Sequence, residues 1–189
     1  MRTFTIATLA ILLACATAFA SPVLTLSPAI ATGEPGQTTG WGFTLTNPDS
    51  TWITVNSAEF CIDVLGPPFC TGSSLGTFND YTGINIFSVA ALGPGGSFTE
   101  SFVAGLSGIG SFDISPLALI GQFENGRIQL NYDTWSDDPF ACGFSCGLTF
   151  GNYVTADAGI TVTPEPGSML LLGTGLAGMA GIIRRRLQK

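Results

Sequence analysis

The 189-residue sequence contains no histidine and very little positive charge. Without histidine there can be no Ser-His-Asp or Cys-His catalytic arrangement and no imidazole ligand for zinc. Between residues 21 and 162 a single basic residue, Arg127, stands against twelve carboxylates, which gives this region a formal charge of −11. So acidic a region repels phosphate backbones and anionic headgroups. We therefore expect no nucleic-acid partner and no peripheral attachment to anionic lipid.

The same region also lacks any stretch with the apolar period of an amphipathic helix. Apolar and polar residues alternate instead over short stretches, which is the period of half-buried strands, and 25 glycines and 11 prolines in the chain supply turns. Seven to nine strands in residues 21–162 predict an all-β, antiparallel β-sandwich. We expect the strands at Val23–Leu26, Trp41–Leu45, Ile53–Val55, Ile84–Val89, Phe98–Val103, Ile109–Ile114, Ile128–Tyr132 and Ile160–Val162.

One stretch refines this fold prediction. The residues Gly36–Asn47, with the sequence GQTTGWGFTLTN, resemble the opening of immunoglobulin-like domains in exported bacterial proteins. The resemblance implies that this stretch forms a strand that crosses the core. It therefore implies an immunoglobulin-like sandwich, and it brings no functional residue with it.

Cysteine is scarce, and one of the five cysteines, Cys15, lies in the N-terminal apolar segment. The other four, Cys61, Cys70, Cys142 and Cys146, are even in number, so in an oxidising compartment they predict two disulfide bonds. Three connectivities are possible, and the simplest joins Cys61 to Cys70 and Cys142 to Cys146. Zinc binding is the weaker alternative, because the spacings differ from those of paired Cys-x-x-Cys knuckles.

Residues 1–20 have the layout of a signal peptide. A basic residue precedes a short apolar stretch, and Ala18 and Ala20 place small side chains at positions −3 and −1 before Ser21. The apolar stretch is too short for a comfortable membrane span. We expect signal peptidase to cut before Ser21. In the alternative interpretation Cys15 ends a lipoprotein box and is acylated.

Residues 163–189 predict a C-terminal anchor with a processing motif. Two prolines around one glutamate form a stiff, extended segment that an enzyme can bind as a linear epitope. An apolar run follows at about 168–183, close to the short limit for a transmembrane helix. The basic tail, 184–189, orients this helix with the tail in the cytoplasm and the domain outside. The residues concerned are Pro164, Glu165 and Pro166 in the motif and Arg184, Arg185 and Arg186 in the tail.

This order of motif, apolar helix and arginine cluster resembles the PEP-CTERM sorting signal. The resemblance implies recognition by exosortase, an integral membrane, transpeptidase-like enzyme of Gram-negative bacteria that make exopolysaccharide. It also implies an exported protein that is anchored in the inner membrane before processing and then belongs to the envelope or the extracellular matrix. A plain C-terminal membrane anchor is the alternative.

Three acidic residues beside Trp135 could in principle bind calcium. Asp133, Asp137 and Asp138 lie close together in the sequence and carboxylates suit this ion. They lack the regular alternation and the glycine of a calcium loop. We therefore expect a solvated acidic loop and no metal site.

Two further groups could carry chemistry on sugars. Glu59 and Asp63 could supply the carboxylate pair of a glycoside hydrolase, although surface charge explains them better. Trp41, Trp52 and Trp135 could form a platform on which sugars stack, although core packing explains Trp41.

The sequence thus predicts three parts: a signal peptide at 1–20, a β-sandwich at 21–162 and a sorting signal at 163–189. It predicts a non-catalytic exported protein with no catalytic residue and no cofactor, whose partners are the two processing enzymes, the membrane and, in the matrix, polysaccharide. A carbohydrate- or protein-binding module is the first alternative and a glycan hydrolase the second. An exposed tryptophan pair would favour the former, and two carboxyls about 5–9 Å apart in a cleft would favour the latter.

Overall fold

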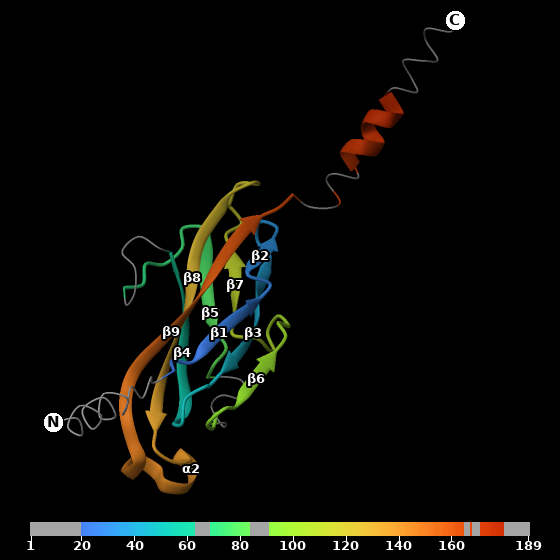
Figure 1. The fold of residues 1–189 in the computed structure, drawn as a ribbon. Coiled ribbons are helices and arrows are strands. Elements are labelled where there is room, and N and C mark those ends of the chain that lie inside the picture. Colours follow the sequence, from blue (N-terminus) through green and yellow to red (C-terminus); the bar gives the residue numbers. More distant parts are fainter. Residues whose placement is uncertain (1–19, 63–68, 84–90, 165–166, 168–170, 180–189) are drawn as a thin grey trace, which may run out of the picture.

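The computed structural model describes residues 20–62, 69–83, 91–164, 167 and 171–179. The domain in this part of the chain is a sandwich of two β-sheets (Figure 1). The all-β sandwich predicted from the sequence is therefore confirmed, and the helices that interrupt it in the described residues are a single turn each.

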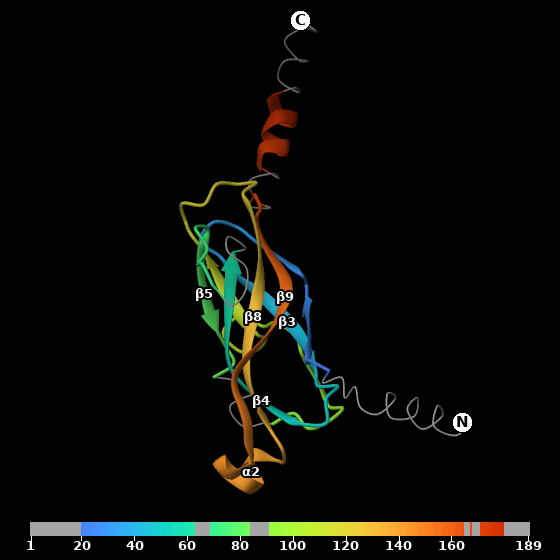
Figure 2. The ribbon, with the colours of Figure 1, turned by 60° about the vertical axis from the view of Figure 1, so that its left-hand side comes forward.

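The sandwich contains nine strands in the described residues. The first sheet has the order β1 (Val23–Ser27), β3 (Thr38–Thr46), β7 (Gly110–Ile114) and β5 (Gly76–Asp80), and β6 (Ser97–Glu100) also pairs with β3. The second has the order β2 (Ile30–Gly33), β9 (Gly147–Val162), β8 (Phe123–Trp135) and β4 (Trp52–Ile62). β8 and β9 form a long hairpin (Figure 2), and the helices α2 (Pro139–Cys142) and η2 (Gly143–Cys146) lie at its tip.

The prediction of a purely antiparallel sandwich is wrong at one strand pair. β1 pairs antiparallel with β3 in the first sheet, and the chain then passes Pro28, which has no N–H to extend that ladder. It continues in the second sheet as β2, where Ile30 lies opposite Gly159 of β9 in a parallel pair. β1 and β2 are the two parts of one strand that is divided between the sheets. Both parts run in the direction of β9, so β2 and β9 form a parallel pair.

Alternate residues of the strands fill the space between the sheets, as their period predicts. Trp41, Phe43 and Leu45 of β3 expose at most 1% of their surface. The Trp41 ring stacks on Phe60 of the opposite sheet, with ring centroids 5.5 Å apart. Its indole N–H donates to the Ala29 carbonyl at 3.3 Å, so the buried polar atom is paired. This aromatic contact joins the two sheets at the centre of the core.

A β-bulge in β4 changes which residues face the core. The register to β8 shifts between Val55 and Ser57. Before the bulge Ile53 and Val55 are buried, and after it Ala58 and Phe60 are buried. One extra residue exchanges the faces of a strand, because successive side chains point to opposite sides.

The predicted strands at 23–26, 41–45, 53–55, 109–114, 128–132 and 160–162 are confirmed, and most are longer than predicted. The sequence analysis missed β2 and β5, which have four and five residues and no strong alternation. The strand predicted at 98–103 ends at Glu100, and Val103 forms only an isolated bridge with Ser107. The strand predicted at Ile84–Val89 lies outside the described residues.

Candidate functional site: the exit of the C-terminal segment

The C-terminal segment leaves the sandwich at a point that is held by several hydrogen bonds. Val162, the last residue of β9, exchanges hydrogen bonds of 2.8 and 2.9 Å with the loop that precedes β8. The Thr163 N–H donates to the Gly33 carbonyl at 2.8 Å, and the Thr163 hydroxyl donates to the same oxygen at 3.2 Å. Pro164 follows and is exposed. The sandwich therefore holds the chain as far as Thr163 and releases it at the first residue of the Pro-Glu-Pro motif.

Beyond the exit, part of the segment is described. Residues 171–179 form a helix in which every side chain is exposed, and its large apolar residues are Leu171, Leu172, Leu176 and Met179. In the portion of the chain that the structure describes, no helix has the length and apolar character that a membrane span requires. The predicted transmembrane segment, 168–183, lies partly outside that portion, as do Glu165, Pro166, Arg184, Arg185 and Arg186.

Both predicted disulfide bonds are confirmed, in the simplest connectivity. Cys61 is bonded to Cys70 with Cα atoms 4.7 Å apart, and Cys142 is bonded to Cys146 with Cα atoms 6.0 Å apart. Among the described residues, the one group of three potential metal ligands is Glu59 with Cys61 and Cys70. A disulfide offers no thiolate to a metal ion, so the structure contradicts the zinc alternative at this pair.

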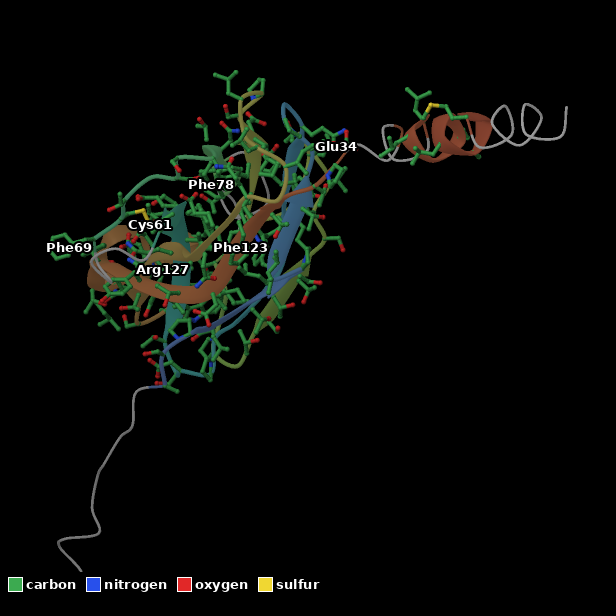
Figure 3. All side chains as sticks on the ribbon, turned by 90° about the horizontal axis from the view of Figure 1, so that it is seen from above. Glu34, Cys61, Phe69, Phe78, Phe123 and Arg127 are labelled. Atoms are coloured by element: carbon green, nitrogen blue, oxygen red, sulfur yellow. A yellow bond between two sulfur atoms is a disulfide. The ribbon has the colours of Figure 1, made fainter. Side chains whose placement is uncertain are left out.

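Arg127 has a structural role that the sequence analysis did not foresee. This residue of β8 lies opposite Cys61 of β4 and exposes 3% of its surface. Its Nη2 atom donates to the Phe69 carbonyl at 2.6 Å, in the loop that the first disulfide closes (Figure 3). The single cation of the sandwich region thus ties that loop to the sheet. The signal in the sequence was a lone arginine in a region with a formal net charge of −11.

The three acidic residues near the hairpin tip each accept a hydrogen bond from a nearby backbone N–H. Asp133 accepts from Gly151 at 2.8 Å, and Asp138 accepts from Phe140 at 2.9 Å as the N-cap of α2. Asp137 accepts from the Asp138 N–H at 2.8 Å. These carboxylates do not gather into a group of potential ligands in the described chain, and their local bonds agree with a solvated acidic loop.

The tryptophans do not form a sugar-binding platform. Trp41 is in the core, and Trp135 exposes 7% of its surface while its indole N–H donates to the Thr54 hydroxyl at 2.9 Å. Trp52 is half-buried and its ring packs beside Gly93. The three tryptophans therefore do not supply the exposed pair that would favour a carbohydrate-binding module. Asp63 lies outside the described residues, so the interpretation of Glu59 and Asp63 as surface charge stays a prediction.

A cavity of about 500 Å³ opens at the end of the sandwich where the hairpin projects. Ile53 and Tyr132 contribute to its walls, and Ser21 and Asp49 lie at its margin. Burial raises the pKa of the Tyr132 phenol above its ordinary value of 10.0, and the negative charge of Asp49 raises it further. The phenol is therefore protonated at neutral pH.

The fold and the exit define the class of the protein: a disulfide-bonded β-sandwich that carries a C-terminal sorting segment. The family model of the PEP-CTERM protein-sorting motif matches residues 162–186. The match begins at the last residue of β9 and includes the Pro-Glu-Pro motif, the apolar run and the three arginines. The chain is therefore a PEP-CTERM sorting domain-containing protein. The motif marks it as exported and directed to the cell envelope, and implies processing by exosortase.

The comparisons give little beyond this motif. No curated protein matches the chain. A solved structure that does match is the ASH / PapD-like domain of human CEP192 (PapD-like domain 7), with 12% sequence identity and a TM-score of 0.34. The match covers 78% of this chain and 89% of that domain. At this level the likeness says nothing about function.

Proposed function

We propose that this chain is a non-catalytic exported protein whose β-sandwich is brought to the envelope or the exopolysaccharide matrix by exosortase. The observation that carries the proposal is the position of the motif. The sorting match begins where the hydrogen-bonded sandwich ends, with Pro164 as the first exposed residue after Thr163. A processing enzyme can thus reach the motif without unfolding the domain.

In this proposal the two ends of the chain act in sequence. Signal peptidase removes residues 1–20, and the apolar run at 168–183 holds the protein in the inner membrane. Arg184, Arg185 and Arg186 keep the tail in the cytoplasm, because moving an arginine to the bilayer centre costs about 2.5–3.5 kcal/mol on insertion scales. Exosortase then recognises the motif just outside the membrane.

The distance between domain and membrane is short in this arrangement. From Thr163 to residue 168, where the predicted span begins, there are about five residues, which reach at most ~17 Å when fully extended. Prolines on both sides of Glu165 favour such an extended backbone. The motif would therefore lie directly between the sandwich and the bilayer, with the Glu165 carboxylate on the outer side.

The test compares single variants in cells that contain exosortase. We expect Glu165→Ala to insert in the membrane and stay unprocessed, whereas Glu34→Ala, which removes a carboxylate from the β2–β3 turn, matures normally. Replacing all three arginines by serine should let the short helix slip through and release unprocessed protein. The mass of the protein in membrane and medium fractions reports each outcome. If the Glu165 and arginine variants mature and localise like the parent, the proposal is wrong.

A second candidate function is a carbohydrate-binding module, and the cavity near Tyr132 is the observation that favours it. Its volume of about 500 Å³ is in the range of about 300–1,000 Å³ for small-molecule sites. The Tyr132 hydroxyl and the Asp49 carboxylate could bind sugar hydroxyls there. Calorimetry with neutral oligosaccharides tests this candidate, and heat of binding that persists in the Tyr132→Phe variant would argue against this cavity.

A further inference from the structure

The loop between β7 and β8 exposes large apolar side chains without any charge. Residues 115–122 have the sequence SPLALIGQ. Leu117 exposes 88% of its surface, Leu119 68% and Ile120 61%. Contiguous apolar surface of this kind on a folded domain marks a contact with a partner or a membrane.

The loop has a defined backbone structure. The Ala118 N–H donates to the Ser115 carbonyl at 3.0 Å, and the Gln122 N–H donates to the Leu119 carbonyl at 3.1 Å. The Gln122 side chain in turn accepts from the Leu119 N–H at 2.6 Å. These internal bonds present the apolar side chains outward on an ordered turn, so their exposure is built into the fold.

The same loop is bonded to the exit of the sorting segment. The Gly121 N–H donates to the Val162 carbonyl at 2.8 Å, and the Val162 N–H donates to the Gln122 carbonyl at 2.9 Å. Pro164 begins the Pro-Glu-Pro motif two residues later. Figures 1 and 2 show the loop at the end of the sandwich where β9 ends. The exposed apolar loop and the exit of the C-terminal segment are therefore held together at one end of the domain.

We propose that Leu117, Leu119 and Ile120 enter the outer surface of the bilayer that holds the chain's own tail, so that the sandwich docks on the membrane while it awaits processing. This inference rests on the proposed function, because the tail must first be inserted. The short link keeps Thr163 within ~17 Å of the start of the predicted span, and the end of the loop is bonded to the neighbouring Val162. Lipid is the occupant because the loop is apolar and is bonded to the residue that leads into the bilayer.

The acidic character of the domain works against attraction to anionic lipid, so the contact depends on the anchored tail for its location. The carboxylates that flank the loop in the sequence, Asp113 and Glu124, are engaged by neighbouring side chains: Asp113 accepts from the Thr38 hydroxyl at 2.6 Å and from the Asn79 amide at 2.9 Å. The Glu124 carboxylate accepts from the hydroxyl groups of Ser73 and Ser74.

The experiment uses the full chain in vesicles of phosphatidylethanolamine and phosphatidylglycerol, made with or without brominated acyl chains. Leu117→Trp places a fluorescent probe in the loop. Phe150→Trp is the matched control, since Phe150 is 60% exposed on β9 near the hairpin tip, at the opposite end of that strand from the exit. Flotation of the vesicles measures tail insertion separately. Because the parent already contains Trp41, Trp52 and Trp135, its emission is subtracted from that of each variant. We expect the added Leu117→Trp emission to shift to the blue and to be quenched by brominated lipid, and the added Phe150→Trp emission to be unaffected.

Three other results would overturn the inference. If the chain floats with the vesicles but the Leu117→Trp emission is neither shifted nor quenched, the tail is anchored and the loop stays in water. A blue shift without quenching would show that protein covers the loop, either a second copy or another partner. A chain that fails to float with the vesicles would refute both membrane docking of the loop and the anchoring step of the proposed function.

Discussion

Removal of the Cys61–Cys70 disulfide should lower the stability of the whole sandwich, whereas removal of Cys142–Cys146 should not. The first bond closes a loop with a sequence separation of 9, and the second closes one of 4. The chain-entropy model assigns them about 2.6 and about 1.9 kcal/mol. The loop entropies alone thus differ little, and the difference in effect must come from where each bond lies in the fold.

The first disulfide is anchored on the second sheet, where Cys61 lies opposite Arg127. Cys61 is completely buried on β4, and the Ile62 N–H donates to the Thr71 carbonyl at 2.9 Å just beyond the closed loop. Arg127 adds its hydrogen bond to Phe69. The loop therefore cannot open without disturbing the sheet, and the full entropy contribution should appear in global unfolding. The Cys142–Cys146 bond joins α2 to η2 at the hairpin tip, which can open locally while the sandwich stays folded.

The assay is urea denaturation of the full chain in mild detergent, followed by the intrinsic tryptophan fluorescence, to which buried Trp41 and Trp135 contribute. The Cys61→Ala, Cys70→Ala double variant should lower the midpoint by roughly 0.9–2.6 M, from about 2.6 kcal/mol and a slope of about 1–3 kcal/mol per M. The Cys70→Ala single variant lacks the disulfide but keeps the buried Cys61 side chain. It therefore separates the effect of opening the loop from the effect of losing the packing of Cys61.

The double variant Cys142→Ala, Cys146→Ala should leave the midpoint almost unchanged. Equal shifts for the two double variants would refute the reasoning, because they would show that the hairpin tip unfolds together with the sandwich.

Three further predictions follow from the ends of the chain and from the cavity. The mature protein should begin at Ser21, since Ala18 and Ala20 fit signal peptidase, and N-terminal sequencing that finds a lipid-modified Cys15 would make it a lipoprotein. Asn47→Ala should destabilise the domain by about 2–3 kcal/mol in urea, because the completely buried amide donates to the carbonyls of Thr51, Leu92 and Gly93; a change below about 0.5 kcal/mol would contradict this. The raised pKa of Tyr132 contributes stability that is complete below pH 10 and is lost as pH rises through the folded pKa. The difference in phenolate absorbance between the parent and the Tyr132→Phe variant should therefore appear above pH 10. In the Asp49→Asn variant this absorbance should appear at a lower pH than in the parent. A titration of Tyr132 at the ordinary pKa of a phenol would refute the burial argument.

Much of the fold was predictable because strands and turns have local signatures. The alternation in Trp41, Phe43 and Leu45 predicts a strand with one buried face, and all three side chains are buried. Short β2 has four residues, too few to show a period, and its parallel pairing depends on β9, which is more than a hundred residues away. The bulge after Val55 was hidden for a similar reason, because only the register against β8 reveals it.

By itself the sequence determined the sorting motif, the even set of exported cysteines and the strand-forming character of the domain, since each depends on residue types at short spacing. The tertiary structure decided the partners of those residues. It placed Arg127 on the Phe69 carbonyl, put Trp41 in the core and Trp52 opposite Trp135, and bonded the apolar loop around Leu117 to the exit of the tail. The contacts of Arg127 and of the loop join residues 40 to 58 positions apart in the chain, and the burial of Trp41 depends on both sheets together. No local period or spacing encodes them, because they form only when the sandwich closes.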